Sequence, residues 1–299
     1  MPLVLLAGPT GRLGHLIAAA LLRRGATVRA LVRPGTPPDK LKGLEGTEIV
    51  AAGYDDPAAL ASALAGVDVV VSALNGLREV IVDAQGALLD AAVKAGVKRF
   101  IPSDYAANIF ALETGENRNF DLRRAFHDTH LAQAPIGRTS ILVGGFMDLL
   151  LWGRGLDFKA HQMNYWGTPD QPLDYTTMAD TAEIAAAAAL DPEAPAVLET
   201  FGDRITARQL SATASEVLGT PFSLNRLGGI DELKALIDSE RRVHPEAEAE
   251  TFPRFQQLQY THNMQSGRGA LIHPGNRYGL KLISVRELLT ANAARLKSA

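Results

Sequence analysis

Residues 3–14 read Leu3-Val4-Leu5-Leu6-Ala7-Gly8-Pro9-Thr10-Gly11-Arg12-Leu13-Gly14, and this stretch decides the fold. Its apolar first half predicts a buried strand, and the Ala/Leu-rich residues up to about Arg24 predict a helix after the glycine turn. The glycines let the backbone bend sharply and approach a ligand, while the helix N-terminus offers unpaired N–H groups and a positive dipole end to an anion. A strand, a glycine turn and a helix in this order form the first half of a dinucleotide-binding unit, here with the spacing G-x-x-G-x-x-G.

Composition excludes several classes of protein. The 299 residues carry a net charge of -3, and 46% of them are hydrophobic and 21% charged, which is typical of a soluble globular protein and not of a disordered chain. No basic run is present, so we expect no nucleic-acid partner. The absence of cysteine excludes disulfides and thiolate chemistry. No basic leader or long apolar stretch occurs, so we expect no membrane partner and a cytoplasmic location.

The second strand indicates the cofactor. Residues 27–33 alternate in polarity and stop at Pro34-Gly35, as a buried strand followed by a loop does. An acidic residue at the end of this strand would bind a free 2′-hydroxyl of the adenosine ribose. The chain has Arg33 there, and a guanidinium grips a 2′-phosphate with charge-assisted hydrogen bonds. We therefore expect NADP(H) as the cofactor, with Arg12, Lys40 and Lys42 as further cations around the same 2′-phosphate. The alternative is that Arg33 is a solvated surface residue.

Strands and helices continue to alternate up to residue 143. Strands are expected at 48–51, 67–73, 99–102 and 139–143, and helices at 57–65, 78–95 and 119–132. This order predicts an α/β fold, a Rossmann-type doubly wound parallel sheet over residues 1–150. A smaller C-terminal substrate lobe is expected over residues 151–299, with some segments returning to the first domain.

Ligands of parallel sheets bind at the carboxyl ends of the strands. The residues expected to contact the cofactor therefore lie in three loops and at the end of the second strand: Gly8, Pro9, Thr10, Gly11, Arg12, Leu13, Gly14, Arg33, Ala73, Leu74, Asn75, Ser103, Asp104 and Tyr105. For Asp104, an N-cap at a strand-to-helix turn is an equally good interpretation.

The second half of the chain is less regular. Helices are expected at 183–190 and 206–218, the second ended by Gly219, and a strand at 197–202. Residues 244–275 show a weak pattern that is typical of a lid or binding loop. Aromatic and methionine side chains gather after the last Rossmann strand and would suit a flat aromatic substrate, with core packing as the equal alternative; they are Phe146, Met147, Trp152 and Tyr165.

These motifs resemble the NmrA-like, isoflavone-reductase-like branch of the atypical short-chain dehydrogenases. The resemblance runs nearly end to end and rests on the glycine loop, on Leu31-Val32-Arg33-Pro34, on Ser72-Ala73-Leu74, on residues 95–105 and on residues 278–289. It implies a Rossmann-type domain with a small substrate lobe, bound NADPH, and reduction of aromatic, phenolic or quinone-like small molecules.

One position departs from the family. The plant reductases carry a proton-handling lysine where this chain has Arg123, in the setting Phe120-Asp121-Leu122-Arg123. An arginine stays protonated, so it cannot act as a general base, but it can stabilise a developing oxyanion. His127 and His130 follow on the same helical face, and His127 is the candidate proton donor. Surface histidines are the alternative, and no further ligands at recognisable spacing support a zinc site.

Two functions from different classes follow. The first is an NADPH-dependent oxidoreductase that transfers a hydride to a small aromatic, phenolic, enone or quinone-like substrate, with Arg123 and His127 as catalytic residues. The second is an NADP(H)-binding redox sensor of the NmrA type that regulates a protein partner without turnover. The expected binding partner is thus a small aromatic molecule, and a homodimer is a possible assembly.

Overall fold

Six parallel strands form the sheet that the N-terminal sequence predicts. In the computed structural model, which describes residues 1–297, their order is β3-β2-β1-β4-β5-β6. They are β1 (Leu3–Ala7), β2 (Thr27–Val32), β3 (Glu48–Ala51), β4 (Val69–Ser72), β5 (Arg99–Ile101) and β6 (Gly137–Arg138). From β1 the chain adds β2 and β3 on one side of the sheet, and it then adds β4, β5 and β6 on the other side. This change of side between β1 and β4 is typical of doubly wound folds. The predicted fold class is confirmed.

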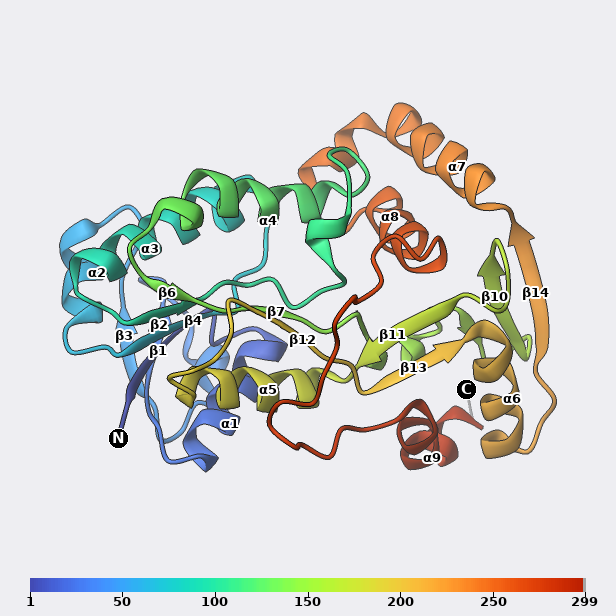
Figure 1. Cartoon of the computed structure of the whole chain (residues 1–299), viewed down its shortest axis with the longest axis horizontal. Helices are drawn as coiled ribbons and strands as arrows, with labels where there is room; N and C mark the ends of the chain where they lie inside the picture. Colours follow the sequence, from blue (N-terminus) through green and yellow to red (C-terminus); the bar gives the residue numbers. More distant parts are fainter. Residues whose placement is uncertain (298–299) are drawn as a thin grey trace. The chain divides into compact units, whose positions relative to one another are not determined.

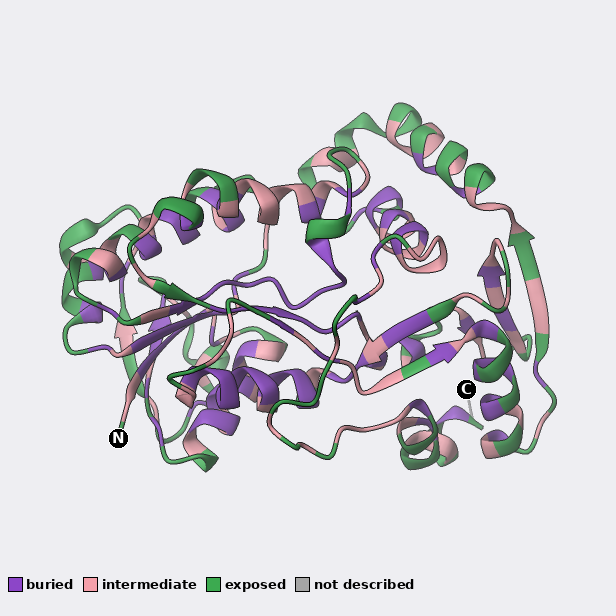
Figure 2. Cartoon of the chain, viewed as in Figure 1, coloured by how far each residue is buried: buried purple, intermediate pink, exposed green. Residues whose placement is uncertain are grey.

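Helices cover both faces of this sheet, with α1 and α5 on one face and α2, α3 and α4 on the other (Figure 1). Their bounds are α1 (Arg12–Arg23), α2 (Pro57–Leu64), α3 (Gln85–Lys94), α4 (Arg118–Thr129) and α5 (Met178–Leu190). A π-helical segment, η2 (Glu79–Ala84), precedes α3. The central strands and the alanine-rich α5 are buried (Figure 2). This burial explains why their sequences read as continuous apolar runs.

The chain divides into two compact units. The first comprises Met1–Tyr105, Phe120–Ile141 and Thr181–Leu198, and the second comprises Ala106–Asn119, Leu142–Asp180 and the chain from Glu199 onward. The units are interleaved along the sequence, whereas the predicted boundary at residue 150 was a single cut with returning segments. Each unit has its own hydrophobic cluster, centred in the first on residues such as Leu5 and Phe100.

The second unit contains short strands and several helices. One sheet has the order β14-β10-β9 and another β13-β11-β8, and β12 pairs with β7. The strands of the two small sheets are β8 (Gly145–Phe146), β9 (Leu156–Asp157), β10 (Gln162–Trp166), β11 (Pro172–Thr176), β13 (Asp203–Thr206) and β14 (Ser223–Gly228). Strands β7 (Ser140–Leu142) and β12 (Val197–Glu199) begin in the first unit, and the last residue of each belongs to the second. The helices are α6 (Ala207–Leu218), α7 (Ile230–Val243), α8 (Arg254–Gln265) and α9 (Val285–Leu296). As expected, α6 ends at Gly219, which has a left-handed conformation.

The expected lid or binding loop over residues 244–275 is wrong for its central part, which is helix α8. The buried face of this helix is polar, because Gln256, Gln259 and Asn263 are almost fully buried. Gln259 and Gln256 accept hydrogen bonds from the backbone N–H groups of Arg118 and Asn119 at 3.1 and 3.3 Å. Periodicity of apolar residues therefore could not reveal this helix. Within residues 1–297, no helix combines the length and apolar character that a bilayer crossing requires.

Candidate cofactor-binding site

The loops predicted to bind the cofactor meet at the carboxyl edge of the six-stranded sheet. They follow β1, β4 and β5, which are adjacent, and Arg33 follows β2 on the other side of β1. The N–H of Ala73 donates to the carbonyl of Ala7 at 2.8 Å, and the hydroxyl of Ser103 donates to the carbonyl of Leu74 at 2.7 Å. The structure therefore brings together segments that are far apart along the chain.

Two of the three loop glycines are required by the chain's own packing. Gly8 has a left-handed φ of 77°, and a Cβ there would lie 2.6 Å from the carbonyl oxygen of Ala73. A Cβ on Gly14 would overlap the carbonyl oxygen of Gly8. At Gly8 the turn packs against the residues that follow β4, and at Gly14 the first turn of α1 packs against the loop. A side chain at either glycine would push the two packed segments apart.

Gly11 is different, because nothing in the fold excludes a side chain there. Its φ is -79°, it is exposed, and an added Cβ would meet only the Gly8 carbonyl oxygen at an ordinary 3.6 Å. The fit to a bound pyrophosphate supplies the missing reason, since a ligand that lies on the backbone at this turn needs the space of the side chain.

The start of α1 is electrostatically prepared for an anion. Gly11 is its N-cap and provides no side-chain oxygen, and the first turn contains no acidic residue. Arg12 instead places an exposed cation beside the positive end of the helix dipole, which is unfavourable for the helix alone. A phosphate bound at this end would reverse the sign of both effects. The residues present thus fit the diphosphate of a dinucleotide.

Arg33 lies exposed directly after β2. Tyr54 is close to it: burial raises the pKa of the Tyr54 hydroxyl, and the Arg33 guanidinium partly opposes that rise. Lys40 and Lys42 follow in the same loop and are exposed. This edge of the sheet is therefore cationic, as a 2′-phosphate would require.

The loop after β5 is rigidly held. Gln85 is buried in α3, and its side-chain oxygen accepts a hydrogen bond from the N–H of Ser103 at 3.1 Å. Ser103 and Tyr105 are both buried, and burial raises the pKa of the Tyr105 hydroxyl. The interpretation of Asp104 as an N-cap is wrong, because no helix starts there. Nothing in the sequence around Gln85 indicates that its side chain holds the loop after β5 in place.

Helix α4 brings both predicted catalytic residues to this loop. Phe126 is buried against Phe100 of β5, with 6.1 Å between ring centroids, and this packing fixes the helix on the sheet. On either side of Phe126, the Nε of Arg123 donates to the carbonyl of Ser103 at 3.0 Å, and Nε2 of His127 lies 2.8 Å from a carboxylate oxygen of Asp104.

The contact between His127 and Asp104 was missed by the sequence analysis. The Asp104 side chain is 1% exposed and that of His127 13%, so the surface interpretation of His127 is wrong. An ionised carboxylate only accepts hydrogen bonds, so Nε2 carries the proton of this pair. The Ser140 hydroxyl lies 3.4 Å from the same nitrogen. His130 does not join them, because its ring stacks on Phe126 and lies against Gly86.

The predicted substrate residues lie in the second unit in different environments. Met147 and Tyr165 belong to its hydrophobic cluster, which is the core-packing alternative. Phe146 is half-buried in β8, and the Trp152 residue is 55% exposed. Their contact with a substrate stays a prediction, as does contact of the loop residues Leu13, Asn75 and the others with the cofactor.

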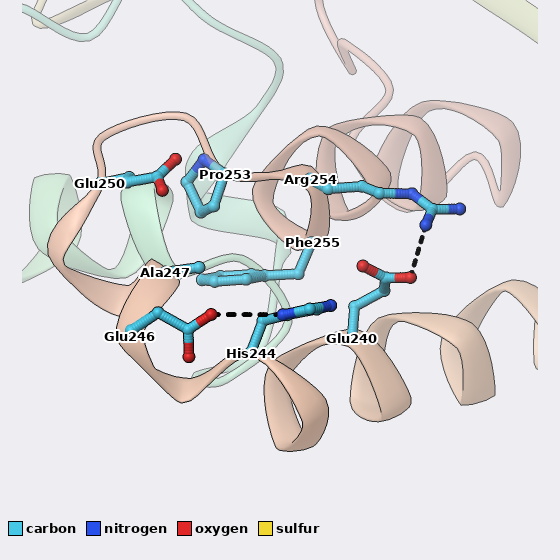
Figure 3. Close-up of a pocket in the computed structure, with 8 residues that line it drawn as sticks. All are labelled: Glu240, His244, Glu246, Ala247, Glu250, Pro253, Arg254 and Phe255. Carbon is cyan, nitrogen blue, oxygen red and sulfur yellow. Dashed lines mark hydrogen bonds and ion pairs between the residues drawn. The ribbon is translucent and has the colours of Figure 1, made fainter.

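The second unit also contains a surface cavity of about 210 Å³ (Figure 3). None of the residues predicted to bind cofactor or substrate lines it. Figure 3 draws two contacts among its lining residues, Arg254 with Glu240 and His244 with Glu246. The nitrogen–oxygen distances are 2.7 and 3.2 Å. The remaining lining residues are Ala247, Glu250, Pro253 and Phe255.

Together, the sheet order and the glycine turn define a Rossmann-type α/β protein with a turn of the dinucleotide-binding kind. The sequence model of the NmrA-like family matches residues 2–272. The chain therefore belongs to the NmrA-like family.

Individual relatives agree with this assignment. The chain is 34% identical over 152 residues to a probable pinoresinol-lariciresinol reductase 3 of Arabidopsis thaliana; the match covers 50% of the chain and 49% of that protein. The chain thus spans about half the length of that relative. It is 29% identical to the (4-alkanoyl-5-oxo-2,5-dihydrofuran-3-yl)methyl phosphate reductase of Streptomyces griseus subsp. griseus, over 91% of the chain and 90% of the relative.

A solved structure shows the same fold. AtPrR2 with NADP+ and (+)pinoresinol superimposes with a TM-score of 0.81 at 21% identity, covering 97% of this chain and 98% of that one.

Proposed function

We propose that this protein is an NADPH-dependent reductase of a small conjugated molecule, aromatic, phenolic, enone or quinone-like. The observation that carries the proposal is the combination of Gly11, which the chain's own packing leaves open, with Arg33 at the end of β2. The first fits a diphosphate on the backbone of the turn, and the second fits a phosphate on the ribose.

When bound, the cofactor supplies a hydride from its nicotinamide ring. Arg123 is the residue that holds negative charge as it develops on the substrate oxygen. Its carbonyl partner at Ser103 fixes the guanidinium at the carboxyl end of β5, so little reorganisation is needed during the reaction. A permanently charged arginine suits this role, because stabilising an oxyanion requires no proton exchange.

His127 is the proposed proton source. The buried carboxylate of Asp104 lies 2.8 Å from Nε2 of His127 and orients its ring, and this contact supports the assignment. A proton held by this pair can reach the product through water. The family resemblance implies a lysine as the proton-handling residue of the plant reductases. The separate roles of Arg123 and His127 are therefore specific to this proposal.

The names of the relatives support the substrate class. The Arabidopsis relative is named for pinoresinol and lariciresinol, and the Streptomyces relative for an alkanoyl oxo-dihydrofuran, a ring whose carbon–carbon double bond is conjugated with carbonyl groups. Hydride addition to such a double bond produces an enolate, which is the charge that Arg123 would stabilise.

Cofactor preference is tested by titrating NADPH and NADH against the purified protein and following nucleotide fluorescence. We expect NADPH to bind roughly 10- to 100-fold more tightly than NADH, because Arg33 adds charge-assisted hydrogen bonds to the 2′-phosphate. Arg33→Asp should reverse the preference, since an acid repels the 2′-phosphate and accepts hydrogen bonds from a free 2′-hydroxyl. Equal affinity of the wild-type protein for both nucleotides would remove the basis of the proposal.

Turnover is tested with a panel of enones and quinones while the absorbance of NADPH is followed. Consumption of NADPH that depends on the acceptor is the expected result. Tight NADPH binding without consumption across the whole panel would instead favour the redox-sensor function.

A further inference from the structure

His15 joins two parts of the cofactor site. It lies next to Gly14 in the first turns of α1, and its Nδ1 is 3.1 Å from the carbonyl oxygen of Gly11. Its Nε2 is 2.8 Å from the carbonyl oxygen of Lys42, 27 residues later. The ring also lies against Gly43, where an added Cβ would be 3.1 Å from Cδ2. The imidazole thus bridges the glycine turn and the loop that follows Arg33.

The chemistry of this bridge assigns the roles of the ring nitrogens. Both partners are backbone carbonyl oxygens, which only accept hydrogen bonds, so a ring nitrogen that bonds to either of them donates. The carbonyl of Gly11 already accepts the backbone N–H of His15 at 2.9 Å. The bond from Nε2 to the carbonyl of Lys42 is therefore the one that holds the loop on α1.

The loop held by His15 is the one that carries the cations beyond β2. The hydroxyl of Thr36 donates to the carbonyl of Arg33 at 2.6 Å, and a short 3-10 helix, η1 (Pro38–Leu41), leads to Lys42. Leu44 is buried and anchors the far end of the loop. Between Arg33 and Leu44, the bond to His15 ties the loop to α1 at the level of the glycine turn.

We propose that His15 is a positioning residue for the 2′-phosphate of the cofactor: its ring ties Lys42 to α1 beside the glycine turn and so holds the cationic loop at the end of β2. This inference rests on the proposed function, because it assigns a role within the same cofactor site. His15 touches no part of the reacting centre, so it acts on nucleotide selectivity through the loop.

The experiment compares His15→Leu, which removes both ring donors, with His15→Lys, whose ammonium can donate to the carbonyl of Lys42. NADPH and NADH dissociation constants are measured for wild type and both variants under the same conditions. Loss of the bridge in His15→Leu should weaken NADPH binding by about fivefold or more, and NADH binding by less than about twofold. His15→Lys should retain the wild-type preference.

His15→Ala, which also lacks a side-chain donor, serves if thermal unfolding shows that His15→Leu does not fold. It should weaken the binding of NADPH selectively in the same way.

Two results would overturn the inference: unchanged NADPH affinity in the donor-deficient variant, or equal weakening for both nucleotides. Failure of the proposed function looks different, because wild-type protein would then bind neither nucleotide or would not distinguish them.

Discussion

Gly11, at the scale of the single residue, separates what the fold needs from what a ligand needs. Gly8 and Gly14 are enforced by contacts within the chain, whereas Gly11 has ordinary space around an added Cβ. A spacing of glycines in the sequence cannot make this distinction, because all three letters are the same.

Alanine substitution of Gly14 should therefore mainly affect stability, and that of Gly11 mainly nucleotide binding. Gly14→Ala should lower the free energy of unfolding by about 2–4 kcal/mol, because its methyl group overlaps the Gly8 carbonyl. Gly11→Ala should lower it by no more than about 1 kcal/mol, the range of an N-cap change, yet weaken NADPH binding about tenfold. Chemical denaturation and nucleotide titration measure the two quantities; a Gly11→Ala protein that binds NADPH normally would contradict the assigned role.

Arg123 provides a second residue-scale prediction. Arg123→Met should reduce kcat by about 100-fold or more, because it removes the charge that faces the developing oxyanion, while the dissociation constant of NADPH changes little. Arg123→Lys keeps a charge and should retain more activity than the methionine variant. Steady-state kinetics with an accepted enone give both numbers. Equal activity of the methionine variant and wild type would exclude Arg123 from catalysis.

Single residues also show where sequence reasoning reached its limit. Arg33 and the glycine turn could be placed because their chemistry is tied to a position in a repeated pattern of strands and helices. The pairing of Asp104 with His127 could not, because the two residues come together only when α4 packs on β5 through Phe126. His15 gave no signal at all, since its partners are backbone carbonyls.

At the scale of the element, α8 shows the same limit. Its buried face consists of amides that bind backbone N–H groups at the start of α4, so the 3.6-residue apolar pattern of an ordinary helix is missing. By contrast, α1 and α6 have clear apolar faces, and the sequence predicted both closely.

His262 on α8 links this element to pH. Burial lowers the pKa of the His262 imidazole, and Arg268 and Lys234 lower it further, although Glu116 partly opposes them. A lowered pKa in the folded state means that the unfolded chain binds the proton more readily, so the contribution is fully present above the ordinary histidine pKa and is lost as pH falls. The free energy of unfolding should therefore decrease between about pH 7 and pH 5.

Replacing the titrating ring tests this assignment. His262→Gln should make the unfolding free energy less dependent on pH over that range, as measured by urea denaturation at several pH values. His244→Gln is the matched control, because that ring is exposed beside Glu246. If the slope with pH is the same in wild type and His262→Gln, the buried histidine is not its source.

At the scale of the whole molecule, the doubly wound sheet of the first unit was predictable, whereas little of the second unit apart from α6 was. Strands of a parallel sheet are buried on both faces and read as apolar runs separated by regular helices. The second unit has short strands of two to six residues in small sheets, and its helix α8 is buried through polar groups. The interleaving of the two units along the chain arises from contacts between distant segments, which no local pattern records.

The account's central claim is that the carboxyl edge of the first unit's sheet binds a phosphorylated nicotinamide dinucleotide. A crystal structure of the protein with NADP+ tests it most directly. The account predicts the diphosphate on the backbone of residues 8–13 at the start of α1, and the 2′-phosphate within hydrogen-bonding distance of the Arg33 guanidinium. A diphosphate bound away from that turn, or a 2′-phosphate without contact to Arg33, would contradict it.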